Sequence, residues 1–379
     1  MLWRKVSRKQ DKKVSSGTAR RWEKNQPFDS GNIGKILVRA TNWIGDAVMT
    51  TPALGAIRAA FPLTEIVLAA NPAVAELMTP HPFCDSAIVF DKKGPHAGIG
   101  GLWKFCRLIA KERFDLAILF QNAIEAAIIA RLARIKIRAG YNTDGRGMLL
   151  THAIPVTKEA RRLHHTQYYT NMLQGLGIPP VERKVCLQCT DEEKHWAAGV
   201  LGSGRWAAIN PGAAYGSAKR WCPERFGQVA DALSSEFGFK PVLVGGRGEV
   251  EIGREIESQM RAKPLNMIGG TSVRQLMALL ASVELVITND SGPMHVAAAF
   301  DRPIVALFGP TDHLTTSPIC SRFSLVRKET ECAPCLKRQC PTDHRCMMGI
   351  SVNDVLNAVS ALMRPEDGAV ESQRPERFE

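Results

Sequence analysis

Residues 285–295 read LVITNDSGPMH, an apolar run rich in β-branched residues that ends in a polar turn. Such a run, bounded by turn residues, is typical of a strand buried in a parallel sheet. Pro293 follows the turn at a position suited to the start of a helix, where a missing N–H costs nothing. Free backbone N–H groups at that start suit a phosphate, and Gly292 lets the backbone approach it closely. The stretch therefore predicts a strand–turn–helix unit with an anion site at the turn.

The same alternation of short apolar runs and helical patterns extends along most of the chain and starts afresh after about Cys186. A helix is predicted over 46–61, with Pro52 as a kink or restart. Capping boxes at 190–193 and 272–275 predict two further helix starts. Buried strands are predicted at 35–41, 65–70, 86–90, 116–120, 206–211, 241–245, 285–289 and 304–308. Strands that alternate with helices indicate α/β structure with parallel sheets covered on both faces.

The length of 379 residues predicts two domains, because one hydrophobic core rarely grows past about 250–300 residues. We expect two doubly wound, Rossmann-like sheets of similar size that face each other across a cleft. The predicted domains cover 35–185 and 186–363, and the last helix is predicted over 352–363. Residues 1–34 are predicted to be a basic, mobile extension and 364–379 a loose tail.

The composition, 45% hydrophobic and 23% charged, is that of an ordinary globular protein. No apolar run reaches the roughly 20 residues that a membrane-spanning helix needs. The basic start MLWRKVSRKQDKK leads into no apolar segment, so we see no signal peptide and expect a cytoplasmic protein.

Half of the net charge of +12 comes from residues 1–34, which hold nine Lys and Arg against three Asp and Glu. The extension is either a solvated tail or a segment attracted to anionic lipid headgroups. Nucleic-acid binding is a third reading. No helix-turn-helix, zinc-finger or RNP signature supports it, and we expect no nucleic-acid partner.

The turn at 288–295 and the glycine-rich loop at 210–221 (NPGAAYGSAKRW) both follow predicted strands. Asp290 is too acidic to face phosphate, so a sugar hydroxyl is its better partner. In the loop, small residues let a diphosphate lie against the backbone, and Lys219 would neutralise charge on a leaving group. The alternatives are that Asp290 or Ser291 is a plain helix cap and that the loop is a surface turn.

Asp46 follows a glycine in the predicted first strand-to-helix turn, 40–46 (ATNWIGD). A carboxylate there, in the domain opposite Lys219, could take a proton from an attacking hydroxyl. The alternative is an acidic residue placed in a first helical turn by the helix dipole. Glu249 follows another strand in 245–249 (GGRGE), where it could accept from ribose hydroxyls or simply start a helix.

A second group of candidates would form a basic surface on the acceptor side. Arg146, in the loop 140–147 (GYNTDGRG), could form it together with His164 and His165, although solvated loop charge is an equal reading.

Four of the ten cysteines, Cys332, Cys335, Cys340 and Cys346, lie within 15 residues. Four thiolates could form a tetrahedral zinc site, although the second pair lacks the usual C-x2-C spacing. A disulfide or redox pair and reduced packing thiols are the other readings.

The sequence has no Asp-x-Asp pair, which nucleotide-sugar enzymes often use to hold a divalent metal. A Walker A loop, a G-x-G-x-x-G fingerprint and the common hydrolase and kinase signatures are also absent. Diphosphate would therefore be held by Lys219 and backbone dipoles, with no metal or other cofactor required.

Taken together, these segments resemble the heptosyltransferases of glycosyltransferase family 9, in particular the lipopolysaccharide heptosyltransferase II type. The likeness runs from about residue 35 to 362, and the extension at 1–34 lies outside it. It is carried by 40–46, 141–147, 210–221, 289–295, 308–311 (FGPT) and 332–347 (CAPCLKRQCPTDHRCM).

The resemblance implies a GT-B fold, with an N-terminal acceptor domain and a C-terminal nucleotide-sugar domain. It implies an inverting enzyme that moves heptose from ADP-L-glycero-β-D-manno-heptose to the heptose-primed inner core of lipopolysaccharide. Asp46 would be the general base and Lys219 would hold the diphosphate. The other implied donor contacts are Gly212, Ala213, Ala214, Glu249, Asp290, Ser291, Gly292 and His295. The implied acceptor contacts are Asn42, Trp43, Arg146, His164 and His165.

The lipid acceptor implies transient contact with the inner face of the inner membrane. Heptosyltransferase I, or a later core heptosyltransferase, is an alternative of the same class. A nucleotide-sugar 2-epimerase and a non-catalytic nucleotide-sugar-binding protein are alternatives of other classes.

Overall fold

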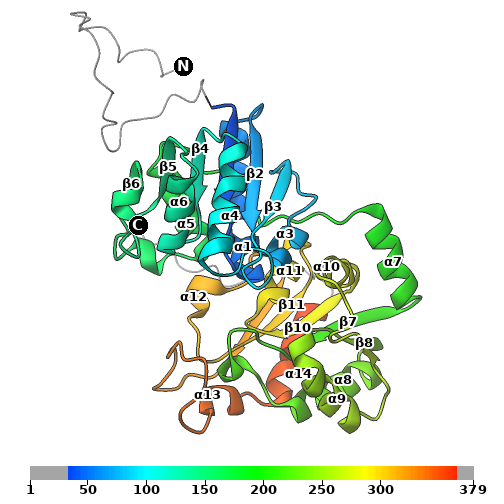
Figure 1. The fold of residues 1–379 in the computed structure, drawn as a ribbon. Helices are drawn as coiled ribbons and strands as arrows, with labels where there is room; N and C mark the ends of the chain where they lie inside the picture. Colours follow the sequence, from blue (N-terminus) through cyan, green and yellow to red (C-terminus); the bar gives the residue numbers. More distant parts are fainter. Residues whose placement is uncertain (1–32, 365–379) are drawn as a thin grey trace, which may run out of the picture.

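The computed structural model describes residues 33–364, which form two parallel six-stranded sheets with helices packed on their faces (Figure 1). The strand order is β3-β2-β1-β4-β5-β6 in the first sheet and β12-β11-β10-β7-β8-β9 in the second. We call the parts built on these sheets the first and second lobes. The α/β prediction with two doubly wound sheets of similar size is confirmed.

The first lobe contains β1 (Lys35–Arg39), α1 (Ile44–Met49), α2 (Thr51–Ala60), β2 (Glu65–Ala70), α3 (Pro72–Leu77), β3 (Ser86–Val89), α4 (Gly98–Lys111), β4 (Leu116–Leu119), α5 (Ile124–Leu132), β5 (Ile137–Tyr141), β6 (His152–Ile154) and α6 (His165–Gln174). The second contains α7 (Asp191–Leu201), β7 (Arg205–Asn210), α8 (Pro223–Ser235), β8 (Phe239–Leu243), α9 (Val250–Gln259), β9 (Leu265–Asn266), α10 (Val273–Ser282), β10 (Leu285–Asn289), α11 (Gly292–Ala299), β11 (Ile304–Phe308), α12 (His313–Thr316), β12 (Phe323–Arg327), α13 (Arg345–Met348) and α14 (Val352–Met363).

All eight predicted strands are present, with ends shifted by up to two residues. The predicted helix 46–61 is two helices that meet at Thr50, and Pro52 lies in the first turn of α2, as a restart requires. Both capping boxes form, at Thr190 and Ser272, and the last helix has its predicted bounds. The sequence reading missed β5, β6, β9 and β12.

The central strands are buried on both faces, as expected for parallel sheets covered by helices. Every residue of β4, β10 and β11 is buried. Because all strands in a sheet run the same way, their carboxyl ends share one edge, and the ends of β1 and β10 both lead to the junction of the lobes (Figure 1).

Polar contacts join the lobes on either side of this junction. The Glu76 carboxylate, at the end of α3, accepts hydrogen bonds from the backbone N–H groups of Val273 and Arg274 at the start of α10, at 2.9 and 3.3 Å. Arg274 donates in return to the carbonyl of Leu77. Acidic oxygens suit the positive end of a helix, so this contact fixes α10 against the first lobe.

No helix among residues 33–364 is long and apolar enough to cross a membrane. The predictions for 1–34 and 364–379 fall almost entirely outside the described residues. The domain boundary between 185 and 186 stays a prediction.

Candidate active site

The site is built where two helices, one from each lobe, begin close together. α1 follows the carboxyl end of β1, and α11 follows that of β10. A side-chain carbon added at Gly45 would lie 2.8 Å from the His295 ring and 3.5 Å from Gly292, and one added at Gly292 would lie 3.2 Å from Ile44. Only glycines allow this approach. Gly292 therefore allows the opposite helix to come close, and its approach to a phosphate stays a prediction.

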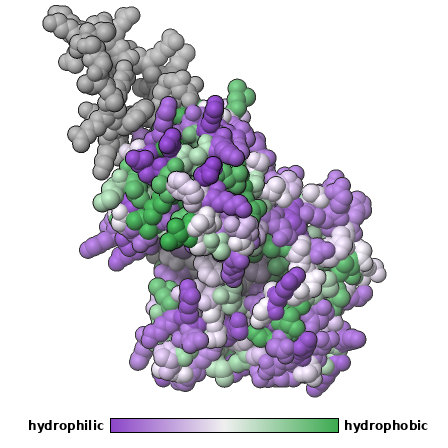
Figure 2. Space-filling view, in the orientation of Figure 1, coloured by the Kyte–Doolittle hydropathy of each residue, from purple (hydrophilic) through white to green (hydrophobic). Residues whose placement is uncertain are grey.

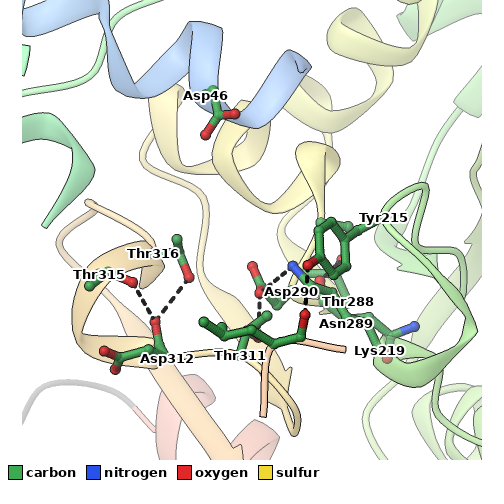
Figure 3. Close-up of polar contacts among 12 residues, drawn as sticks. Asp46, Tyr215, Lys219, Thr288, Asn289, Asp290, Thr311, Asp312, Thr315 and Thr316 are labelled. Atoms are coloured by element: carbon green, nitrogen blue, oxygen red, sulfur yellow. Dashed lines mark hydrogen bonds and ion pairs between the residues drawn. The ribbon is translucent and has the colours of Figure 1, made fainter. Parts of the chain in front are cut away.

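Asp46 lies in the first turn of α1, with its side chain 28% exposed. Its carboxylate points toward the part of the second lobe that carries Lys219 and Asp290 (Figure 3). His165, the first residue of α6, places Nδ1 at 3.4 Å from Asp46 Oδ1. The carboxylate thus keeps access to solvent while an imidazole stands beside it.

Lys219 and Asp290 form a buried ion pair within the second lobe. Lys219 Nζ lies 2.7 Å from Asp290 Oδ2, and the two side chains are 12% and 5% exposed. Thr311 donates its hydroxyl to the same carboxylate oxygen at 2.6 Å. Lys219 also lies 4.9 Å from the centre of the Tyr215 ring (Figure 3). The ammonium is held at the end of β10, beside the start of α11, by charge and by an aromatic face.

A network of buried polar side chains lies next to the Lys219–Asp290 pair. Asn210, which ends β7, accepts from the hydroxyls of Ser291 (2.8 Å) and Thr288 (3.2 Å). Asn289, which ends β10, donates to the carbonyl of Pro211 and accepts from the backbone N–H of Trp221. The asparagines pin both ends of the glycine-rich loop to the sheet, which leaves the Lys219 position little freedom.

The cysteine-rich segment, residues 332–346, lies over the same loop. Tyr215 donates its hydroxyl to the carbonyl of Leu336, and the Ala218 N–H donates to the carbonyl of Arg338. A side-chain carbon at Gly216 would lie 2.1 Å from that Arg338 oxygen. The segment therefore forms an outer wall of the Lys219 loop, a role that its sequence did not indicate.

Glu249 and Gly212 meet on the far side of the loop. A side-chain carbon at Gly212 would lie 1.8 Å from a Glu249 carboxylate oxygen, and the carboxylate accepts from the Gly246 N–H at 2.8 Å. Burial raises the pKa of Glu249, although the Gly246 N–H and Arg220 oppose the shift. Ala213 is buried beside Gly212, and Ala214 is exposed.

His295 is buried in α11, where the charges of Asp290 and Asp46 both act on its ring. Burial lowers the pKa of His295 to about 4, against the opposing charges of Asp290 and Asp46. The ring is neutral at pH 7, so it offers a hydrogen-bond donor and an acceptor without adding charge.

The five predicted acceptor contacts separate into two groups. Asn42 and Trp43 are exposed beside Asp46, and His165 contacts it. Arg146 is fully buried, and its guanidinium donates to the carbonyls of Tyr141, Leu119 and Gln121. His164 is also buried, with Nε2 2.9 Å from the carbonyl of Ser317 in the other lobe. The structure thus brings Arg146 and His164 to no exposed surface, and both hold backbone together.

All ten cysteines are free thiols, and Cys346 is buried while Cys332 is exposed. Within residues 33–364, no group of three or more His, Cys, Asp or Glu side chains is arranged to hold a metal ion. The structure therefore does not agree with the alternative of a disulfide within residues 332–346.

Sequence reasoning missed Thr311, Asn210 and Asn289 as parts of the site. The signal was present for the asparagines, because each ends an apolar strand directly before a turn rich in glycine and proline. Thr311 ends the segment 308–311, which belongs to the family resemblance, but its contact with Asp290 depends on how β11 lies beside β10 and no local pattern indicated it.

A carboxylate on one lobe thus faces a lysine, a helix start and a neutral histidine on the other. This arrangement suits transfer between a hydroxyl and a group that leaves as an anion. The family model described as "Glycosyltransferase family 9 (heptosyltransferase)" matches residues 102–345.

Among curated proteins, lipopolysaccharide heptosyltransferase 2 of Salmonella typhimurium is 29% identical over 352 residues, which cover 88% of this chain and 99% of the relative. Lipooligosaccharide heptosyltransferase 2 of Campylobacter jejuni is 28% identical over 339 residues, 87% of this chain and all of the relative. The solved structure of ADP-heptose LPS heptosyltransferase II of Escherichia coli matches with a TM-score of 0.75 at 28% identity, over 86% of this chain and 98% of that one. The chain therefore belongs to glycosyltransferase family 9, the heptosyltransferases, and is a glycosyltransferase of the GT-B fold.

Proposed function

We propose that the protein transfers heptose from ADP-heptose to the heptose-primed inner core of lipopolysaccharide. The observation that carries the proposal is the opposition of Asp46, on one lobe, to the Lys219–Asp290 pair and the start of α11 on the other. The names of the relatives from Salmonella typhimurium and Escherichia coli support both substrates.

In the proposed reaction, Asp46 takes the proton of the acceptor hydroxyl as its oxygen attacks the anomeric carbon of the heptose. The bond from that carbon to the diphosphate breaks, and ADP leaves from the opposite side, so configuration inverts. Lys219 and the backbone N–H groups of Ser291 and Gly292 stabilise the negative charge on the departing diphosphate. His295 and Asp290 would position the sugar, and Glu249 the ribose.

These residues suffice for the chemistry without a bound metal, because the charge on the leaving group is met by an ammonium and a helix start. We further propose that the enzyme acts in the cytoplasm and visits the inner face of the inner membrane, where a lipid acceptor would be found.

The test is release of ADP by the purified protein from ADP-heptose and heptose-primed Kdo-lipid A, with EDTA and with Mg²⁺. We expect equal, acceptor-dependent release under both conditions. Asp46→Asn should lower kcat by about 10²–10⁴-fold, the usual contribution of a general base. Asp191→Asn is the matched control, because Asp191 occupies the first turn of α7 and is 83% exposed.

Full activity in Asp46→Asn would refute the mechanism, and dependence on Mg²⁺ would refute the metal-free reading. Kdo-lipid A without heptose and a longer core serve as alternative acceptors. Preferential release with either would reassign the enzyme to the first or to a later heptosyl transfer.

A further inference from the structure

The outer face of the first lobe, formed by α4 and the carboxyl end of α5, exposes large apolar side chains. On α4, Ile99 is 89% exposed, Trp103 55% and Leu108 39%, and Leu132 at the end of α5 is 44% exposed. Figure 2 shows apolar residues gathered on this lobe with strongly hydrophilic ones around them. Exposed apolar side chains that cluster in this way mark a contact surface.

The same face carries a dense group of cations. Among the described residues, no ion pair is formed by the side chains that make up this group, namely Lys104, Arg107, Lys111, Arg113, Arg131, Arg134 and Lys136. The nearby acidic residues are engaged elsewhere. Glu112 pairs with Lys35, Glu125 pairs with Lys92, and Asp115 accepts from the backbone of Gly34 and Lys35.

Two adjoining cavities indent this face. One, of about 570 Å³, is lined by apolar residues that include Trp103, Phe114 and Leu132, by the cations of Arg107, Arg113, Arg134 and Lys136, and by Asp115. The other, of about 380 Å³, is lined by Arg131, Arg134, Lys136 and Arg138. A lining of apolar side chains and an excess of cations fits a ligand that has both acyl and phosphate parts.

Crowded cations repel one another, and exposed tryptophan and isoleucine side chains order water, so the face is unfavourable while bare. A bilayer with anionic headgroups relieves both costs. Phosphates meet the cations, Trp103 lies at the headgroup level, and Ile99, one turn before it on the same side of α4, reaches the acyl boundary. Nucleic acid would meet the charge but not the apolar side chains.

We propose that the face formed by α4 and the carboxyl end of α5, residues 98–113 and 131–138, docks the enzyme on an anionic lipid bilayer. The proposal rests on the proposed function in one respect, since it names the surface by which the enzyme reaches a lipid acceptor. α4 begins after the carboxyl end of β3, the sheet edge that also carries Asp46. Residues 113 and 131–138 lie at the opposite edge, where β4 and β5 begin, so docking through this face holds the first lobe on the bilayer by the end away from Asp46.

The first experiment is co-sedimentation of the full-length protein with vesicles of phosphatidylethanolamine and phosphatidylglycerol, against vesicles of phosphatidylcholine alone. We expect binding to the anionic vesicles only. Arg107→Gln and Arg134→Gln should each weaken it about fivefold at low salt. Trp103→Gln should weaken it at every salt concentration, because its contribution is apolar.

Two matched controls lie elsewhere on the surface. Leu63→Gln removes an apolar side chain that is 99% exposed, and Lys263→Gln removes an exposed cation of the second lobe. Both should bind like the unchanged protein. A full-length variant with the nine Lys and Arg residues of 1–34 changed to Gln measures what the basic extension adds.

The proposal is overturned if the protein binds neutral and anionic vesicles equally, or if the variants of this face bind normally while the neutralised extension abolishes binding. It is also overturned if Trp103→Gln changes the oligomeric state in sedimentation velocity without lipid, because the face would then join copies of the chain.

A second arm separates docking from the proposed function. Trp103→Gln and Arg134→Gln should lower turnover of a lipid acceptor in vesicles but leave turnover of a deacylated, water-soluble core unchanged. Equal loss on both acceptors would overturn docking. Absence of turnover of either acceptor by the unchanged protein would refute the proposed function, while the vesicle binding would still decide the docking.

Discussion

At the scale of single residues, the Lys219–Asp290 pair combines structure with chemistry. Both side chains are largely buried, and Thr311 completes the shell of the carboxylate. Removing one partner of a buried ion pair leaves an uncompensated charge, which costs about 3–5 kcal/mol. A loss of activity on changing Lys219 alone is therefore ambiguous.

We predict that Lys219→Met lowers both the free energy of unfolding, by about 3 kcal/mol, and the rate of ADP release. In the double variant Lys219→Met/Asp290→Asn, stability should return because no buried charge is left unpaired, whereas activity should not. Urea unfolding and kcat measured on the four proteins of this cycle provide the test. Recovery of activity in the double variant would show that Lys219 acts only on folding.

The contrast between Asp46 and Arg146 shows how far single residues can be interpreted from sequence. The position of Asp46 in a first helical turn after a buried strand follows from local pattern, and the structure confirms it. Arg146 lies in a loop of turn residues that reads as surface. Besides the nearby Tyr141 carbonyl, its burial depends on the carbonyls of Leu119 and Gln121, which lie 27 and 25 residues earlier in the chain, and local sequence does not reveal such partners. Whether the proposed site residues act in catalysis stays a prediction.

At the scale of elements, the fully buried strands were all predicted, whereas the four missed strands, β5, β6, β9 and β12, all contain partly exposed residues. β10 and β11 are continuous apolar runs because both faces are buried. β9 has two residues, β6 has three, and only one residue of β12 is buried, so these strands leave little apolar pattern. Pairing with a neighbour defines them, and pairing is not a local property.

The crossing of α1 and α11 is the element contact on which the site depends. We predict that Gly45→Ala lowers kcat on the order of 100-fold, because the new methyl group meets the His295 ring at 2.8 Å and moves Asp46 away from the second lobe. Equilibrium binding of ADP, whose proposed contacts all lie in the second lobe, should change little.

Gly199→Ala is the matched control for this substitution. A side-chain carbon at Gly199, within α7, meets nothing within 4 Å. That variant should keep full activity and gain about 0.5–1 kcal/mol of stability. A Gly45→Ala enzyme as active as Gly199→Ala would contradict the close crossing.

At the scale of the whole molecule, His164 couples the joining of the lobes to pH. Its Nδ1 lies 3.3 Å from the Thr166 N–H and so accepts, which leaves Nε2–H to donate to the carbonyl of Ser317 across the junction. Burial lowers the pKa of His164 to about 3, although the Ser317 carbonyl opposes this shift. A second proton on the His164 ring would sit on Nδ1. Nδ1 could then no longer accept from the Thr166 N–H, and the two N–H groups would repel each other.

We predict that stability falls as the pH drops from about 6.5 toward 3. In this window the unfolded chain, with an ordinary histidine pKa near 6.5, binds a proton that the folded chain does not. The loss approaches about 1.4 kcal/mol per pH unit for this imidazole. Above pH 6.5 both states are neutral, and the imidazole adds no slope.

The measurement is urea unfolding at pH 7.0, 5.5 and 4.5, with His164→Gln as the comparison because glutamine can still donate to Ser317. The variant should show a slope shallower by about 1.4 kcal/mol per pH unit. An exposed imidazole serves as the matched control, and His195→Gln, in α7, should leave the slope unchanged. Equal slopes for His164→Gln and the parent would contradict the assignment.

The division of the site between lobes also has a consequence for how activity is acquired during folding. Each sheet pairs only strands from its own part of the chain, whereas Asp46 and Asp290 are brought together only when α1 packs on α11. Contacts between residues so far apart in sequence form late, because the loop between them must close. On dilution from denaturant, secondary structure and ADP binding should return first, and catalytic turnover should be the last property to appear.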